Sequence, residues 1–220
     1  MTVLGLVLAA GAGTRFGPTA KLAAPFRAAG APGATTVIGA AVAAAVAAAL
    51  DEVAVVVGPA GAGSGLDPVA LVEALPADLA AAVTVVVNPG PGDGLASSLR
   101  VGVDHARARG HAAVVVGLGD QPLLDPRAWR AVADAVAGGP SSLVFATYDG
   151  RRGHPVGLAA AVWADLPATG DEGARTVAQL KPQAVGEVPC PGNPADIDTA
   201  ADLARWTRDR PHAEEGAPWS

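Results

Sequence analysis

Two positively charged residues follow closely on a glycine-rich stretch near the N-terminus of the chain. Gly11, Gly13 and Gly17 interrupt this stretch, and Arg15 and Lys21 carry its charges. Glycines let the backbone turn sharply, and successive backbone N–H groups in such a turn can surround an anion. Arg binds phosphate through two parallel hydrogen bonds, whereas Lys acts as a compact point charge. The combination predicts a loop that binds a polyphosphate; the alternative is a glycine-rich turn that binds no ligand.

Two familiar phosphate-binding loops do not match this stretch. The dinucleotide fingerprint G-x-G-x-x-G requires glycine where Phe16 stands, and no acidic residue follows about twenty positions later to bind a ribose. A Walker A loop requires glycine before its Lys and Ser or Thr after it, whereas Lys21 lies between Ala20 and Leu22. The stretch therefore belongs to neither class.

Asp120 is a second candidate for chemistry. It follows the apolar segment 113–116 through two glycines and precedes Gln121 and Pro122. Because ligands of open α/β sheets bind beyond the carboxyl ends of the strands, we expect Asp120 and Gly11 to lie at the same edge of a sheet. Mg²⁺ prefers one or two carboxylates together with phosphate oxygens and water. Asp120 is therefore a candidate magnesium ligand, the alternative being that it caps the turn before Pro122.

The elements that must position these residues alternate between apolar strands and helices. This alternation is typical of a doubly wound α/β fold with a mostly parallel sheet. The predicted strands are 3–8, 53–57, 83–87, 113–116, 143–147 and 184–188. The predicted helices are 38–50, 66–79, 94–109, 126–137, 158–166, 171–180 and 199–208. We expect Asp125 to cap the helix that opens with Pro126, residues 1–208 to form one domain, and 209–220 to form a flexible tail.

Length and composition limit the class of the protein. The 220 residues suit one α/β domain, and half of them are apolar, which provides a sizeable core. The formal net charge of −6 argues against broad nucleic-acid binding, which needs a basic surface. A single cysteine, Cys190, excludes an internal disulfide framework and a cysteine-based zinc site. No secretory signal is visible, and the longest apolar stretch, 37–50, is too short to span a bilayer, so we expect a cytoplasmic protein that binds no membrane.

The glycine-rich stretch resembles a known family signature. The run Leu8-Ala9-Ala10-Gly11-Ala12-Gly13-Thr14-Arg15-Phe16-Gly17, followed by Lys21, is similar to the L-A-A-G-x-x-x-R-F-G-x-x-K loop of the MobA-like nucleotidyltransferases. Ala10 resembles the molybdenum cofactor cytidylyltransferase branch, because the guanylyl-transferring branch usually carries glycine there. The segment 119–123 resembles the G-D-x-P element of the family, whose Asp binds the catalytic magnesium.

Three further segments carry the same resemblance. Residues 148–156 resemble the G-x-x-G-H-P element, and Asn88 with 94–99 resembles the element usually written G-M-G-S-S-L. The segment 196–199 resembles D-I-D-T, although Ala200 and Ala201 stand where Pro and Glu are usual. Together the matches extend over nearly the whole chain.

The resemblance implies a Rossmann-like fold of the nucleotide-diphospho-sugar transferase type and a reaction on that fold. An NMP group, CMP from CTP above all, would pass to a phosphorylated acceptor, molybdopterin or molybdenum cofactor, with release of pyrophosphate. The implied catalytic residues are Arg15, Lys21 and Asp120. The implied nucleotide-binding residues are Leu8, Ala9, Ala10, Gly11, Gly13, Thr14, Arg15, Lys21, Asn88 and Ser97. Acceptor binding would fall to Ser98, Arg152 and His154, and Mg²⁺ would be held by Asp120 with Asp198 or Asp196.

Two alternatives stay open at this point. A transferase of the same fold could act on a sugar phosphate or another alcohol phosphate. A chaperone could instead bind the molybdenum cofactor and pass it to a molybdoenzyme partner without catalysis. The presence of Arg15, Lys21 and Asp120 favours catalysis. We expect His154 to position the acceptor rather than act as a base, because a phosphate monoester is already ionised.

Overall fold

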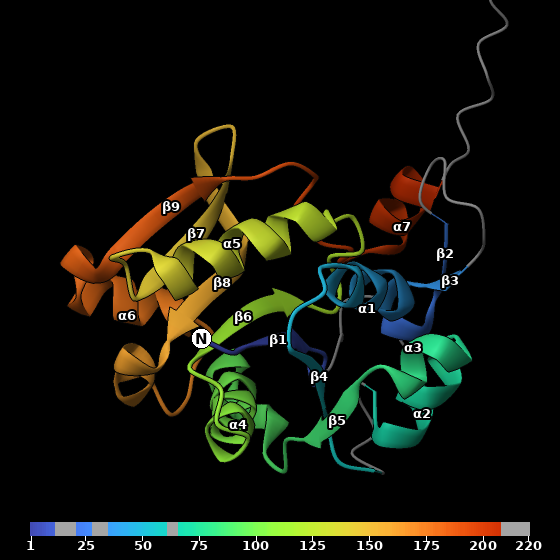
Figure 1. Cartoon of the computed structure of the whole chain (residues 1–220). Coiled ribbons are helices and arrows are strands. Elements are labelled where there is room, and N and C mark those ends of the chain that lie inside the picture. Colours follow the sequence, from blue (N-terminus) through green and yellow to red (C-terminus); the bar gives the residue numbers. More distant parts are fainter. Residues whose placement is uncertain (12–20, 28–34, 61–65, 208–220) are drawn as a thin grey trace, which may run out of the picture.

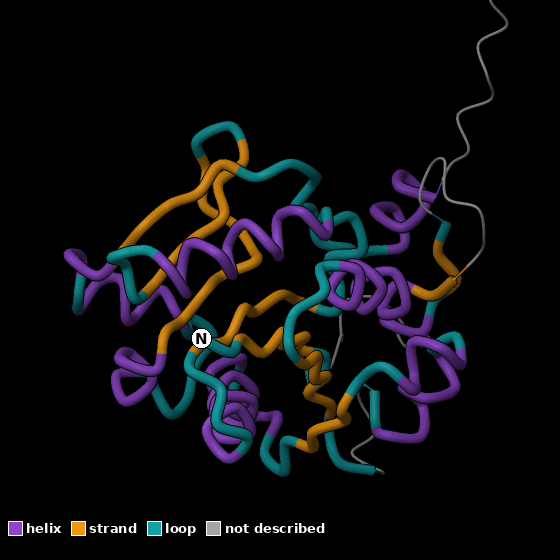
Figure 2. The backbone as a smooth tube through the Cα atoms, in the orientation of Figure 1, coloured by secondary structure: helices purple, strands orange, loops and turns teal. Residues whose placement is uncertain are grey.

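The computed structural model describes residues 1–11, 21–27, 35–60 and 66–207, and these form a sheet between helices (Figures 1 and 2). The main strands are β1 (Val3–Leu8), β4 (Glu52–Val57), β5 (Thr84–Val87), β6 (Ala113–Leu118), β7 (Leu143–Tyr148), β8 (Arg151–Ala159) and β9 (Val185–Pro189). The short strands β2 (Pro25–Phe26) and β3 (Thr35–Thr36) form a separate antiparallel pair.

Seven α-helices and four short 3₁₀ turns surround the sheet in the described part of the chain. The helices are α1 (Val37–Ala47), α2 (Pro68–Ala74), α3 (Ala77–Ala81), α4 (Leu95–Ala108), α5 (Pro126–Gly138), α6 (Ala174–Leu180) and α7 (Ala200–Thr207). The 3₁₀ turns are η1 (Lys21–Ala23), η2 (Pro91–Asp93), η3 (Ala160–Asp165) and η4 (Pro182–Ala184). Each described helix is too short or too polar to cross a lipid bilayer.

The strand order of the main sheet is β5-β4-β1-β6-β8-β7-β9. Strand β8 runs antiparallel to β6 and β7, and the other pairs are parallel. The predicted α/β fold with a mostly parallel sheet is therefore confirmed. The order reverses between β1 and β6, because the chain moves from β1 outward to β5 and then returns to the other side of β1. Such a reversal is where open α/β sheets bind ligands.

Alternate residues of β1 enter two hydrophobic cores on opposite faces of the sheet. Val3 and Val7 belong to the core that includes residues of α1 and α5. Leu4, Leu6 and Leu8 belong to the core that includes residues of α4 and α6. A strand covered on both faces needs apolar side chains at every position, which explains the unbroken apolar run that predicts it.

The structure corrects the predicted secondary structure after Tyr148. The expected helix 158–166 begins as the last part of β8, and only Ala160–Asp165 is helical, as a 3₁₀ turn. The apolar pattern does not reveal β8 because glycines and His154-Pro155 interrupt it. Gly157 is required by packing, since a Cβ there would approach Val132 and Val136 to 3.0 Å. The expected helix 66–79 is likewise two helices, α2 and α3, separated at Pro76.

A charged cluster anchors the opposite edge of the sheet, where β4 begins. The carboxylate of Glu52 lies 3.0 Å from His105 Nε2, 3.1 Å from His111 Nε2 and 3.2 Å from Arg109 Nε, and Thr84 Oγ1 donates to it at 3.0 Å. Burial acts to raise the pKa of Glu52, but these hydrogen bonds outweigh burial and lower the pKa to about 2. The cluster ties β4, β5 and α4 together far from the reversal of strand order.

Candidate active site

Three charged residues that are distant in the sequence meet at the carboxyl edge of the sheet. Lys21 Nζ lies 2.7 Å from Asp120 Oδ2 and 3.2 Å from Asp198 Oδ1. Lys21 opens η1, Asp120 follows β6, and Asp198 precedes α7. Residues predicted to be catalytic or metal-binding are therefore neighbours in the fold.

Main-chain hydrogen bonds explain why these segments meet. Strands β1 and β6 pair in register to their last residues, and the N–H of Gly119 donates to the carbonyl of Leu8 at 2.9 Å. Asp120, next in the chain, accepts from the N–H of Ile197 at 2.9 Å through its main-chain carbonyl. Ile197 is fully buried, so apolar burial holds the segment that carries Asp198 against the end of β6.

The charge state of Lys21 follows from its surroundings. Burial acts to lower its pKa, but hydrogen bonds and charge interactions with Asp120 and Asp198 outweigh burial and raise the pKa. Lys21 is therefore a charged ammonium at neutral pH, with a side chain 11% exposed. It offers a positive charge at a place where the end of β6 and the segment before α7 come together.

Asp196 is the third carboxylate of this region. Its Oδ1 accepts a hydrogen bond of 2.8 Å from Gln121 Nε2. Burial raises the pKa of Asp196, and the nearby charge of Asp120 raises it further. Asp196 therefore resists ionisation more than a free aspartate, and a cation in this region would favour its charged form.

The carboxylates of this region provide some of the oxygen ligands that a divalent cation needs. Asp120 Oδ1 is buried and receives no hydrogen bond from the described residues, so one hard oxygen ligand is free. Oδ2 of the same carboxylate is shared with Lys21. The described residues contain no group of three or more His, Cys, Asp or Glu side chains arranged to hold a metal. Mg²⁺ needs only one or two carboxylates when phosphate oxygens complete its shell, so the set suits a metal that arrives with a phosphate ligand.

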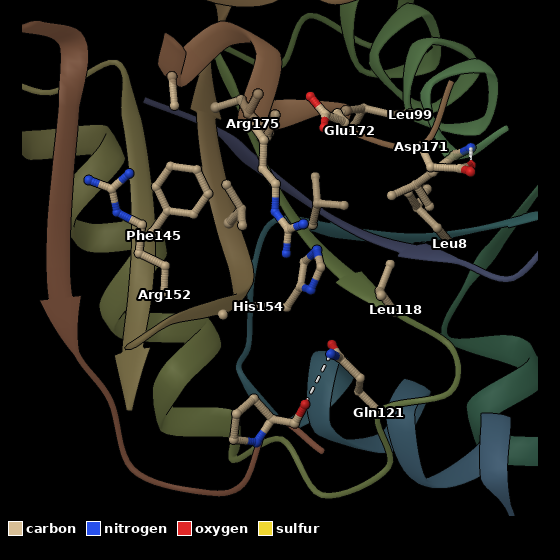
Figure 3. A pocket seen from close by; sticks show the side chains of 18 of the residues that line it. Leu8, Leu99, Leu118, Gln121, Phe145, Arg152, His154, Asp171, Glu172 and Arg175 are labelled. Carbon is tan, nitrogen blue, oxygen red and sulfur yellow. Dashed lines mark hydrogen bonds between the residues drawn. The ribbon is translucent and has the colours of Figure 1, made fainter. Parts of the chain in front are cut away.

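A cavity of about 650 Å³ opens beside these charges (Figure 3). Its walls come from the ends of β1 and β6, from β7 and β8, and from α4 and α6. Most of the lining is apolar: Leu8, Leu95, Leu99, Val116, Leu118, Phe145, Gly153, Val156, Leu158, Ala174, Ala178 and Pro194. The polar lining residues are Gln121, Arg152, His154, Asp171, Glu172, Arg175, Gln179 and Asp196. Apolar walls with a few polar groups are typical of a small-molecule site.

His154, for which the sequence predicts acceptor binding, lies in this cavity, and its role stays a prediction. Burial lowers its pKa to about 4, the charge of Asp120 acts against this, and the positive charge of Arg175 acts with it. The imidazole is therefore neutral at neutral pH. In Figure 3 the guanidinium of Arg175 approaches the His154 ring. The sequence gives no signal for Arg175, because it lies on α6, outside every motif.

Arg152, the second predicted acceptor-binding residue in the cavity, is held by two neighbours. Its Nε donates to Glu187 Oε1 at 2.6 Å, and its guanidinium lies 5.0 Å from the centre of the Phe145 ring. These contacts fix the side chain at the rim of the cavity. A ligand at the rim would contact the Arg152 guanidinium, whose positive charge is already partly neutralised by Glu187.

Asn88, Ser97 and Ser98 form a hydrogen-bond network between β5 and α4. Asn88 Nδ2 donates to the hydroxyls of Ser97 at 2.9 Å and Ser98 at 3.0 Å, and its Oδ1 accepts from the N–H of Gly90 at 2.9 Å. The Asn88 side chain thus has protein partners at both of its polar atoms. Nucleotide binding by Asn88 and Ser97, and acceptor binding by Ser98, stay predictions.

The phosphate loop is described only at its two ends. Leu8 lines the cavity, and Ala9 and Ala10 are buried, with the N–H of Ala9 bound to the carbonyl of Val56 at 2.8 Å. Gly11 is exposed at the end of this segment. The predicted ligands Gly13, Thr14 and Arg15 lie outside the described residues.

Comparison with known proteins identifies the class. Residues 5–188 match the model of the MobA-like NTP transferase domain. This match spans most of the chain, so the protein belongs to the MobA-like NTP transferase family. The expected family is thereby confirmed, and the class is that of the nucleotidyltransferases. A comparison with curated protein sequences gave no match.

Solved structures agree with this class. The crystal structure of Rv0371c from Mycobacterium tuberculosis is 29% identical with a TM-score of 0.69, covering 94% of this chain and 97% of that one. A complex of Rv0371c with manganese is 26% identical with a TM-score of 0.65, covering 94% and 98%. A nucleotidyl transferase from a Methanothermobacter species is 24% identical with a TM-score of 0.70, covering 94% and 96%, and shows the shared fold.

Proposed function

We propose that this nucleotidyltransferase moves CMP from CTP to a phosphorylated acceptor, the molybdopterin of the molybdenum cofactor, and releases pyrophosphate. The observation that carries the proposal is the meeting of Lys21, Asp120 and Asp198 beside the large cavity. A polyphosphate and a metal need charges of both signs close together, and a second substrate needs a separate pocket next to them. Both requirements fit this edge of the sheet.

In this proposal the positive groups hold the nucleotide. Lys21, Arg15 and the main-chain N–H groups of the glycine-rich loop would bind the β- and γ-phosphates. Lys21 would exchange part of its contact with Asp120 and Asp198 for phosphate oxygens. Nucleotidyl transfer then depends on alignment of the attacking phosphate with the α-phosphate and on stabilisation of developing charge.

The carboxylates would hold the metal. Asp120, whose Oδ1 is buried and free of described partners, would be the first ligand, with Asp198 or Asp196 as the second. Bound Mg²⁺ supplies charge neutralisation at the α-phosphate and at the departing pyrophosphate. The manganese in the Rv0371c complex supports a divalent metal in this fold.

The cavity would hold the acceptor. His154 is neutral there, so it can donate or accept one hydrogen bond without adding charge, and the acceptor phosphate needs no general base. The apolar walls suit the faces of a flat heterocycle such as molybdopterin, and the polar lining residues can serve the groups at its edge. In this proposal the reaction takes place in the cytoplasm, and a molybdoenzyme receives the product.

A ligand panel tests the proposal. Thermal unfolding is followed with each of the four NTPs, with and without Mg²⁺. A ligand that binds only the native state raises the melting temperature according to its affinity. We expect the largest rise with CTP and Mg²⁺ together. Equal rises with all four nucleotides would contradict the cytidylyl specificity, and no rise with any nucleotide would contradict the transferase proposal.

A further inference from the structure

The cavity contains one buried polar atom for which the described residues provide no partner. Gln121 is 4% exposed, yet its carbonyl oxygen Oε1 receives no hydrogen bond from the described part of the chain. Gln121 also lines the cavity. In Figure 3 its amide lies below His154, and the dashed hydrogen bond from its nitrogen leads away from the His154 ring. A buried acceptor without a donor is costly, so a bound molecule that supplies a donor gains by it.

Two neighbours fix the direction in which the amide faces. Gln121 Nε2 donates to the main-chain carbonyl of Pro194 at 3.1 Å and to Asp196 Oδ1 at 2.8 Å. A main-chain carbonyl can only accept, so a reversed amide would place two oxygens against each other. Gln121 therefore presents an acceptor, and not a donor, to the cavity.

No described residue donates to Oε1, although the His154 ring lies above the amide in Figure 3. Apolar side chains of Leu8, Val116 and Leu118 line the cavity from the ends of β1 and β6. A molecule that fills the cavity removes solvent from these walls. The molecule itself then has to supply the donor for Oε1, because a polar group buried without a partner weakens binding.

The positive charge of Arg175 adds a second requirement for a ligand of this cavity. Arg175 makes no ion pair with the residues that the structure describes, and its guanidinium points towards His154 (Figure 3). A positive group of this kind favours an anionic ligand. Because Asp171 and Glu172 also line the cavity, this preference applies only next to Arg175. The cavity thus suits a molecule with an apolar-faced body, a donor near Gln121 and a negative group near Arg175.

We propose that Gln121 is a specificity-determining residue of the cavity, whose fixed amide oxygen selects an acceptor substrate with an N–H or O–H donor on a flat, apolar-faced ring. The proposal rests on the proposed function only in taking this cavity as the acceptor site. The preference for a donor belongs to the cavity itself and requires neither nucleotide nor metal.

A matched pair of probes tests this preference. Lumazine, pteridine-2,4-dione, carries N–H donors at N1 and N3, whereas 1,3-dimethyllumazine has the same ring without them. Both are titrated by calorimetry into the wild-type protein and into Gln121→Met, which keeps the length of the side chain but lacks the amide. We expect wild type to bind lumazine at least about tenfold more tightly than the dimethyl compound. In Gln121→Met we expect the two affinities to become nearly equal.

The variant separates the hydrogen bond from the bulk of the methyl groups. That bulk affects binding to both proteins, so it cancels when the two affinity ratios are compared. Gln179→Met, at another amide side chain that lines the cavity, serves as the control, and we expect it to keep the preference for lumazine. Thermal unfolding shows whether each variant folds. The ratio of the lumazine and dimethyllumazine affinities in wild type is a test that needs no variant.

Three results would overturn the proposal: equal affinities in wild type, no measurable binding of lumazine, or an unchanged preference in Gln121→Met. These results are independent of catalysis. A protein that prefers lumazine but releases no pyrophosphate from any NTP would support the role of Gln121 and contradict the proposed function. A protein that releases pyrophosphate but binds both probes equally would support the proposed function and contradict the role of Gln121.

Discussion

Replacement of Lys21 by methionine tests the charged cluster at the edge of the sheet. The variant keeps an unbranched side chain but removes the ammonium that lies 2.7 Å from Asp120 and 3.2 Å from Asp198. A hydrogen bond to a charged group is worth about 1.5–3 kcal/mol. The contact with Asp198 adds less than about 1 kcal/mol, because that carboxylate is 48% exposed.

Loss of the Lys21 ammonium should lower both the stability of the fold and the affinity for the nucleotide. We expect Lys21→Met to unfold about 2–3 kcal/mol more easily at pH 7, which for a chain of this size lowers the melting temperature by roughly 4–12 °C. If Lys21 also contacts the polyphosphate, the KM for CTP rises roughly 10- to 150-fold. Calorimetric unfolding and steady-state kinetics measure the two effects separately.

The difference in stability between wild type and Lys21→Met should depend on pH in a defined direction. Because the pKa of Lys21 is raised, the stability that its ammonium provides is fully present below the unfolded value of 10.5 and is lost as the pH rises through the higher folded value. The difference in stability between wild type and Lys21→Met should therefore stay constant from about pH 7 to pH 9. It should shrink only above pH 10.5.

The chain offers a matched control in its only other lysine, Lys181, which lies 2.5 Å from Asp165 away from the cavity. Both members of that pair are partly exposed, so Lys181→Met should cost less than about 1 kcal/mol and leave CTP kinetics unchanged. Mg²⁺ should restore part of the stability of Lys21→Met, because the metal can replace the lost positive charge at Asp120, and should restore none in Lys181→Met. Unaltered stability and unaltered CTP kinetics in Lys21→Met would refute this reasoning.

Two further variants test the choice of nucleotide and the charged anchor at the other edge. Ala10→Gly should raise the use of GTP relative to CTP by roughly tenfold or more, because the removed methyl group enlarges the room for a purine; kinetics with both nucleotides measure it, and an unchanged ratio would speak against Ala10 as a determinant. Glu52→Gln should lower the melting temperature most above about pH 5. Since the pKa of Glu52 is depressed from 4.5 to about 2, its contribution is present above pH 4.5 and is lost as the pH falls towards 2. A difference between wild type and Glu52→Gln that does not shrink from pH 5 to pH 3 would contradict the hydrogen-bond cluster.

The fold was predictable where strands are buried on both faces. β1, β4 and β6 appear as unbroken apolar runs, because each has a hydrophobic core on either side. β8 was not predictable from such a pattern. Gly157 accommodates close packing against α5, and Arg152 and His154 line the cavity rather than a core. A strand that gives up apolar positions to a cavity and to close helix packing thus loses the pattern that identifies it.

The sequence predicted which charged residues meet at the strand ends, but not which residues from several elements together line the cavity. Asp120 stands out because it follows a buried strand, and Lys21 stands out because it follows a glycine-rich stretch. Gln121 and Arg175 do not stand out, since the role of each depends on which neighbours fill its hydrogen bonds. Neither the pairing of Gln121 with Asp196 nor the approach of Arg175 to His154 is encoded in a local spacing.

The central claim is that this protein transfers a nucleotidyl group with the help of a metal at Asp120. Its most direct test is pyrophosphate release from CTP with Mg²⁺ and molybdopterin, compared between wild type and Asp120→Asn. Asn keeps the size of the side chain but removes the charge that a hard cation requires. We predict release by wild type and a rate at least about a hundredfold lower in Asp120→Asn, with CTP binding retained. No release by wild type with any NTP, or near-native release by Asp120→Asn at low Mg²⁺, would contradict the claim.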